Sequence, residues 1–446
     1  MKKTMMIFIV FCSAIFAQDR VHVTIYNQNR ALVKEIRSVK LRKGTGLLSF
    51  KDVASQIDPT SVYFISKTCP DKLYVIEQNF EYDLVGSEKI LSKYIDKKVS
   101  LTTKDGNEFK GILLSNSRGD VVLKTDSGIE IVQKNILERF SLPKLPAGLI
   151  TKPTLVWQVN NSGPEKQNVE VTYLTTGMNW HAEYIAVIDE EENKLDLTGW
   201  VSINNNTGKL FRDAKIKLIA GDVHIAREQG IMGSSAADAA YLKKAAPQLE
   251  EKQFFEYHMY TLNRLATIKN NQIKQITLFP SARVNYKKTF TFDERRYNNK
   301  IAVRLVFENN KKSGLGIPLP EGKIRVYKKD SDGSQEFIGE DNISHTPKGE
   351  KINLLLGNAF DLTGKRKMVS VDKTGKKSRK ETIEIILKNH KDIPVTIYVY
   401  EHLWGNWKIV KSSHKYNKKD SSTIKFAVQV EPDSTVKIEY TSVISW

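Results

Sequence analysis

The chain has 446 residues, of which 40% are hydrophobic, so it is long enough to bury several cores and suggests about three domains. Lysine and arginine total 69 against 51 acidic residues, a formal net charge of +18. This composition excludes a globally disordered chain, and beyond the N-terminus no apolar run is long enough for a membrane helix. The basic surplus favours anionic partners, although lysines scattered over strand edges also keep sheet proteins from pairing with one another.

The first seventeen residues have the layout of a secretory signal peptide. Two lysines precede an apolar run from Met5 to Phe11, and Ala17 is a small residue suited to cleavage before Gln18. An uncleaved membrane anchor is the alternative, but it needs about 20 apolar residues. We therefore expect residues 1–17 to be removed and the protein to be exported to the periplasm or outer cell envelope. The mature chain is expected to be soluble or peripheral, without a transmembrane helix.

Alternation with a period of two predicts an all-β protein built from several antiparallel β-sandwiches. In the expected N-terminal β domain, residues 18–92, Val23 and Ile25 alternate with polar residues as in a half-buried strand. Residues 93–141 contain short strands separated by Asp- and Gly-containing turns, which tolerate the positive φ of tight hairpins. We expect this segment to be an inserted SH3-like small barrel. Its loops lack the aromatic residues on which bases stack, so no nucleic-acid partner is expected.

A proline-containing linker, residues 142–153, precedes an expected central β domain at residues 154–372. Within that domain the composition of residues 228–254, rich in Ala and Glu, favours a helix or a mobile loop over a strand. Residues 373–446 alternate over the length of an immunoglobulin-like sandwich, which we expect to be the C-terminal domain.

The chain contains no spacing of reactive residues that is typical of a metal site, a nucleotide loop or an activated nucleophile, so no metal and no cofactor are expected. Asp222 and His224 are weak catalytic candidates. Residues i and i+2 of a strand share a face, so this carboxylate and imidazole could serve as an orienting group and a base. A structural turn is the competing interpretation, because the sequence identifies no nucleophile or metal beside them.

The segment from Lys365 to Lys380 is strongly basic. It is either an anion-binding strip or a solvated hairpin, and its composition favours the hairpin. In the first case the expected contacts are Lys376, Lys377, Arg379 and Lys380.

Tryptophans in or beside predicted strands either anchor the core or form a platform on which sugars stack, and their position favours the core. These residues are Trp157, Trp180, Trp200, Trp404 and Trp407.

Several segments of the middle and last regions of the chain resemble sequences of one bacterial family. They are Val169–Tyr184, Leu197–Gly208, Asp213–Val223, Gly357–Asp361 and Ile385–Val395. From about Lys152 to the C-terminus the chain resembles the bacterial domain-of-unknown-function family 4139. It is also similar to the mucoidy-inhibitor-A-like proteins, although it lacks the heptads of their coiled coil. The resemblance implies export and a β fold, and it leaves the activity open because the family has no established one.

The sequence therefore predicts a non-enzymatic binding, structural or interaction protein of the cell envelope. Its expected partners are anionic envelope components or another envelope protein, with peripheral membrane contact. The competing hypothesis is an envelope hydrolase that acts on glycan or peptide with residues assembled from distant strands.

The signal-peptide interpretation makes a direct prediction. Protein recovered from the envelope fraction is expected to begin at Gln18 or its cyclised form, because Ala17 provides the small residue that cleavage needs. Mass spectrometry of the N-terminal peptide measures this. A different first residue would contradict the cleavage site, and a cytoplasmic protein would contradict export.

Overall fold

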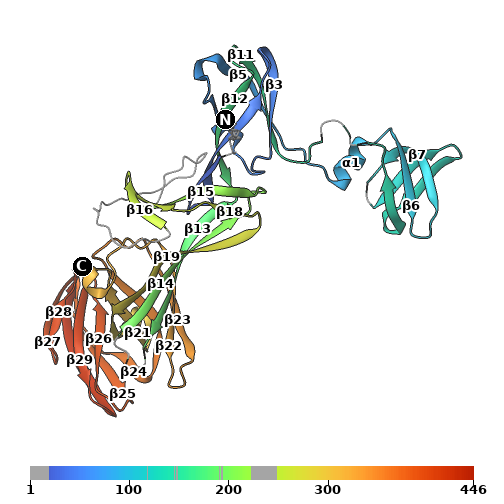
Figure 1. Cartoon of the computed structure of the whole chain (residues 1–446). Coiled ribbons are helices and arrows are strands. Elements are labelled where there is room, and N and C mark those ends of the chain that lie inside the picture. The colour runs from blue at the N-terminus through green and yellow to red at the C-terminus, as the bar shows by residue number, and fades with distance from the viewer. Residues whose placement is uncertain are drawn as a thin grey trace, which may run out of the picture.

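The structure is a computed structural model that describes residues 20–117, 119–144, 146, 149–189, 191, 194–221 and 249–446. Strands in five sheets make up most of these residues (Figure 1). The expected all-β class with several antiparallel sheets is confirmed, whereas the SH3-like and immunoglobulin-like assignments stay predictions. No helix of the described part has the length and apolar character needed to cross a membrane. The expected signal peptide and the candidates Asp222 and His224 lie outside the described residues.

Strands from both sides of the 82–153 segment build the first two sheets. The eight-stranded sheet consists of β1 (Arg20–Tyr26), β2 (Arg30–Lys40), β4 (Tyr63–Ser66), β12 (Lys166–Thr176), β15 (Phe211–Ala220), β16 (Leu249–Phe254), β17 (Tyr257–Leu262) and β18 (Ala266–Ile268). The three-stranded sheet has the order β3 (Gly44–Lys51), β11 (Thr154–Asn161), β5 (Leu73–Glu81). Because β2 pairs with β12, and β3 and β5 both pair with β11, the expected domains 18–92 and 154–372 share these sheets.

Trp157 anchors the core between these two sheets. Its side chain is fully buried, and its ring centroid lies 5.8 Å from that of Phe50 and 4.9 Å from that of Phe64. Its indole nitrogen donates a hydrogen bond to Gln78 at 2.8 Å, so the one polar atom of the ring is satisfied. Trp180 is likewise buried, and core anchoring is confirmed for these two tryptophans.

The third sheet continues the same core. Its order is β19 (Gln272–Asn285), β14 (Lys194–Asn205), β13 (Met178–Ile188), β22 (Gly322–Lys329), β23 (Gln335–Ile343). Just after β14, Lys209 is buried and its ammonium lies 3.0 Å from Glu35 of β2, which also accepts a hydrogen bond from Tyr173 at 2.9 Å. Burial lowers the pKa of Lys209, and Glu35 opposes that shift. This ion pair joins residues that are far apart in the sequence, and removing one partner would leave a buried charge.

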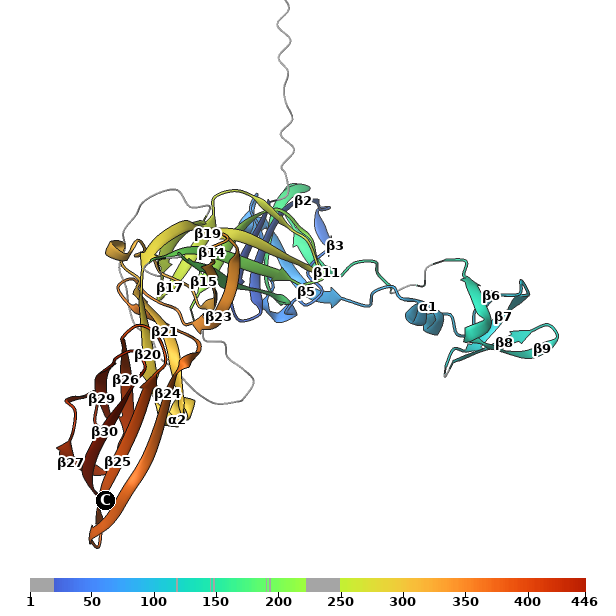
Figure 2. The same ribbon diagram turned by 90° about the horizontal axis from the view of Figure 1, so that it is seen from below.

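The segment between β5 and β11 forms a separate module. It contains α1 (Ser87–Lys93), β6 (Lys98–Thr103), β7 (Glu108–Ser115), β8 (Asp120–Thr125), β9 (Gly128–Gln133), the 3-10 helix η3 (Lys134–Ile136) and β10 (Leu137–Ser141). The sheet order is β10-β6-β7-β8-β9, with a small core of its own. The expected turn after β6 is present, with Gly106 at φ +87. Figures 1 and 2 both show the module standing away from the rest of the chain.

The last sheet has nine strands. They are β20 (Lys287–Phe292), β21 (Lys300–Glu308), β24 (Lys351–Gly375), β25 (Ser378–Asn389), β26 (Val395–His402), β27 (Asn406–Ser412), β28 (Tyr416–Lys418), β29 (Thr423–Val430) and β30 (Ser434–Ser445). Their order is β27-β30-β25-β24-β21-β20-β26-β29-β28. The sheet begins well before the expected boundary at residue 372, which falls inside β24. The remaining short helices are α2 (Glu294–Tyr297), η1 (Pro59–Ser61), η2 (Pro70–Lys72) and η4 (Lys311–Ser313).

Strands β21 and β24 run from the central core into the C-terminal core. In β21, Leu305 belongs to the central core and Ile301 to the C-terminal one. In β24, Ile352 and Leu362 divide in the same way. The two regions are therefore joined by a hydrogen-bonded strand pair and not by a linker.

The expected helix or mobile loop at residues 228–254 is wrong for its last six residues. Leu249–Phe254 forms strand β16, which pairs with β17 at the edge of the eight-stranded sheet. The physical reason is tertiary: β17 continues the sheet from β15, and β16 gains a hydrogen-bonded neighbour that local composition does not reveal. Residues 228–248 lie outside the described residues.

The register around β1 predicts a pH dependence. His22 lies directly opposite Lys215 on one side and Lys34 on the other, and burial together with these lysines lowers its pKa from the ordinary 6.5. The unfolded state then binds more protons between the folded and unfolded pKa values, so stability falls as the pH drops below 6.5. Urea unfolding over a pH series is expected to show a shallower acid loss for His22→Gln than for the parent. Equal slopes would contradict this role.

Candidate binding surface

The hairpin between β24 and β25 holds the four basic residues that the sequence singles out. Lys376 and Lys377 form its turn and are exposed. Arg379 and Lys380 follow on β25, where successive side chains point to opposite faces. Lys380 is exposed, whereas Arg379 points to the same side as the buried Glu381. The structure therefore brings Lys376 and Lys377 together and separates Arg379 from Lys380, so the four do not form one strip.

Arg379 lies against two tryptophan rings. Its guanidinium carbon is 4.9 Å from the ring centroid of Trp404 and 5.8 Å from that of Trp446, and the two ring centroids are 5.1 Å apart. The guanidinium also forms an ion pair with Glu381, which is 5% exposed. The backbone nitrogen of Trp446 donates to the carbonyl of Lys377 at 3.1 Å. Arg379 is thus a structural cross-link that holds both indoles beside the lysine turn.

Both tryptophans remain open to solvent. Trp404 is 44% exposed and Trp446 is 54% exposed, so core anchoring is wrong for Trp404. Trp404 follows the end of β26 and precedes Gly405, which has φ +62, and such a turn turns the side chain out of the sheet. We call Lys376, Lys377, Arg379, Trp404 and Trp446 the tip surface. Trp446 is not among the candidate residues named from the sequence. Its only sequence signal is its position directly after the last strand, β30.

Beside the tip surface, β24 has a free edge. Among the described residues, β24 pairs beyond Thr363 with β25 alone. Met368, Val369 and Val371 are about half exposed there, at 50%, 57% and 49%. Lys367 and Lys373 flank this apolar run, and a register shift between Met368 and Ser370 bends the strand, as in edges that resist pairing with a neighbour. The hairpin therefore ends in a basic and partly apolar projection, which Figure 2 shows beyond the body of the sheet.

A buried ionic cluster fixes the strand that leads to Trp404. The carboxylate of Glu401 on β26 is 3% exposed and accepts hydrogen bonds from the Arg366 guanidinium at 3.0 and 3.1 Å. Tyr440 of β30 also donates to it. Burial raises the pKa of Glu401, and Arg366 opposes that shift. The carboxylate has no access to a substrate, so the cluster ties β24, β26 and β30 together.

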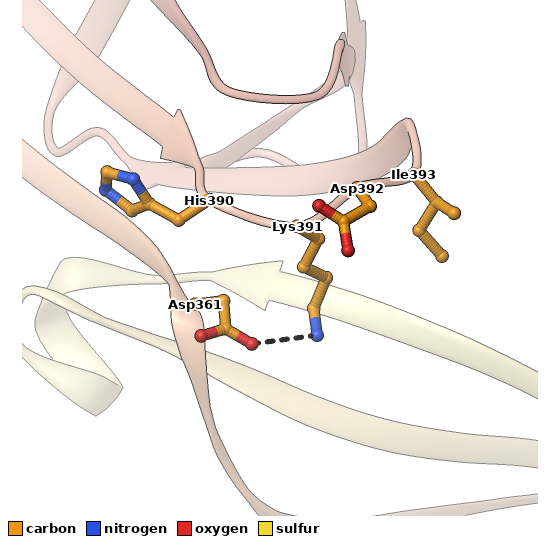
Figure 3. Close-up of a pocket in the computed structure, with 5 residues that line it drawn as sticks. All are labelled: Asp361, His390, Lys391, Asp392 and Ile393. Atoms are coloured by element: carbon orange, nitrogen blue, oxygen red, sulfur yellow. Dashed lines mark hydrogen bonds and ion pairs between the residues drawn. The ribbon is translucent and has the colours of Figure 1, made fainter.

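A shallow depression lies at the other end of β25. It is lined by Asp361, His390, Lys391, Asp392 and Ile393 (Figure 3). The Lys391 ammonium lies 3.4 Å from the Asp361 carboxylate, which compensates both charges. Across the described residues, no group of three or more His, Cys, Asp or Glu side chains is arranged to hold a metal ion. We interpret the depression as the surface of a turn and not as a binding site, because its lining residues are either exposed or paired with each other.

No family model and no curated protein matches this chain. The interpretation of the tip surface therefore rests on its geometry alone.

The cross-link assigned to Arg379 is open to a stability test. Arg379→Ala is expected to cost about 2 kcal/mol of unfolding free energy, because it leaves the buried Glu381 carboxylate without its counter-ion and removes two ring contacts. Urea unfolding followed by tryptophan fluorescence measures both the loss and a change at the indoles. Lys377→Ala is the control and should change stability by no more than about 0.5 kcal/mol. Equal stabilities of the two variants would contradict the assignment.

Proposed function

We propose that this protein is a non-enzymatic binding protein of the bacterial cell envelope that contacts an anionic lipid surface through the tip surface. The observation that carries the proposal is the exposure of Trp404 and Trp446 directly beside the Lys376–Lys377 turn. Tryptophan is favoured where one side of the ring meets an apolar phase and the other meets water. Export, and membership of the resembled family, are part of the same proposal and rest on the sequence.

The chemistry of the tip surface favours a lipid headgroup region over a phosphorylated glycan. Lysine ammonium groups near a bilayer each contribute about 1 kcal/mol of attraction to anionic lipid. The half-exposed Met368 and Val371 of the neighbouring edge add apolar area that a polar glycan would not use. The surrounding chain supports attraction at a distance, because its net charge of +18 becomes +16 when Lys2 and Lys3 are removed with the signal peptide.

A separate experiment tests the hydrolase hypothesis. It predicts that the purified chain hydrolyses envelope glycan or peptide and that substitution of Asp222 or His224 abolishes this activity. Hydrolysis lost in that way would contradict a purely non-enzymatic role.

Vesicle binding tests the proposal. The Lys376→Ala/Lys377→Ala variant is expected to bind phosphatidylglycerol-containing vesicles more weakly by about 2 kcal/mol, roughly thirtyfold, because two lysine contacts are lost. Binding of the parent should fall steeply with salt, since exposed charges act over a Debye length of about 8 Å at physiological ionic strength. Trp404→Ala/Trp446→Ala should also weaken binding while keeping the charge. Co-sedimentation over a lipid series measures all three.

The matched control is Lys311→Ala/Lys312→Ala, which removes two adjacent exposed lysines from η4, in another part of the chain. It should bind as the parent does. If the tip variant also binds as the parent does at low salt, the hairpin is only a solvated turn and the proposal fails. Binding to phosphorylated glycan but not to vesicles would contradict the lipid assignment.

A further inference from the structure

The outer strand of the 93–141 module carries exposed isoleucines at an unpaired edge. In the described sheet, β9 pairs only with β8. Ile129 and Ile131 are 67% and 68% exposed, and residues i and i+2 of a strand share one face. Val122 of β8 lies directly opposite Ile131 and extends the same apolar row. Figure 2 draws β9 on the side of the module that faces away from the rest of the chain.

This edge carries little of the usual protection against strand pairing, because Glu130 is the single charged residue of β9. The outer strands β27 and β28 of the nine-stranded sheet carry Lys408, Lys411 and Lys418, whereas β9 contains neither lysine nor proline. Edges with exposed apolar residues and no such charge are sites where another strand adds. The row of isoleucines is therefore placed where a partner strand would cover it.

We infer that β9 pairs with β9 of a second copy of this chain, antiparallel, with Ile131 opposite Ile131. The module is almost neutral, with nine basic and seven acidic residues between positions 93 and 141, so two modules can approach although the whole chain carries +18. The other outer strand of the module, β10, presents Arg139 and Ser141 where β9 presents Ile129 and Ile131, so an apolar match requires two β9 strands.

Charge also selects the register. A pairing centred on Glu130 would place two carboxylates directly opposite each other, which is unfavourable. Moving the centre by one residue to Ile131 sets Glu130 opposite Val132 and Ile129 opposite Gln133. The two Ile131 side chains then meet on one face beside the two Val122 side chains, and a ten-stranded sheet runs through both modules.

Cysteine cross-linking tests both the contact and its register, in the mature chain with Cys69 replaced by alanine, because Cys12 belongs to the expected signal peptide. Directly opposite Cβ atoms lie about 4.5–5.5 Å apart, close enough for a disulfide after small adjustment. Ile131→Cys is therefore expected to give a covalent dimer on oxidation. Ile129→Cys is the matched control, because it has the same exposure but lies roughly 13 Å along the strand from its copy. Failure of Ile131→Cys to cross-link, or equal cross-linking of both variants, overturns the pairing.

The non-covalent assembly provides the second measurement. Sedimentation equilibrium of the parent is expected to show a concentration-dependent dimer, and Ile131→Lys should raise its dissociation constant on the order of tenfold or more, because like charges then face each other. Ile273→Lys changes an isoleucine that is 66% exposed on β19 and should leave the dimer unchanged. A parent that stays monomeric, or a dimer that Ile131→Lys does not weaken, overturns the inference. These outcomes do not depend on lipid binding at the tip surface.

Discussion

The continuity of β24 is the constraint on which the C-terminal part of the molecule depends. This strand pairs with β21 from Lys351 to Thr363 and with β25 from Leu362 to Gly375, so one backbone passes through two cores and then projects as the hairpin. A hydrogen-bonded strand transmits position more rigidly than a linker, because the partner strand along each stretch, β21 and then β25, restrains its backbone. The orientation of the tip surface is therefore set by the central core.

The buried ion pairs of this protein tie distant strands together. The exposed lysines of the tip surface, in contrast, are accessible to a partner. Glu35 with Lys209, and Glu401 with Arg366, each join elements that are distant in sequence and have almost no exposure on the acidic side. Arg379 combines a buried and an exposed role. Its guanidinium forms an ion pair with the buried Glu381 and also contacts the rings of two solvent-exposed tryptophans. It positions the aromatic residues while the turn lysines stay available.

The β24–β25 hairpin and the 93–141 module differ in the residues at their free strand edges. Lysines and a bulge interrupt the free edge of β24, which disfavours pairing with another strand and leaves the charges for an anionic surface. The edge of β9 has isoleucines and a single acidic residue, Glu130, which favours a neutral strand of the same kind. One projection is thus suited to a charged surface and the other to a second copy, and the modular layout allows both at once.

The sequence by itself determined the β class, the separate 93–141 module and several of its turns, because alternation with period two and turn chemistry are local properties. It did not reveal that strands from residues 20–81 complete sheets of residues 154–262, since register and partner choice are decided by packing between distant segments. The basic run could be seen in the sequence, and alternation along a strand separates Arg379 from Lys380. The contacts of Arg379 with Trp404 and Trp446 could not be seen, because they join segments that are distant in the sequence. Only the tertiary structure placed Trp404 and Trp446 beside Lys377, because that proximity joins the end of β26, the C-terminus and the β24–β25 turn.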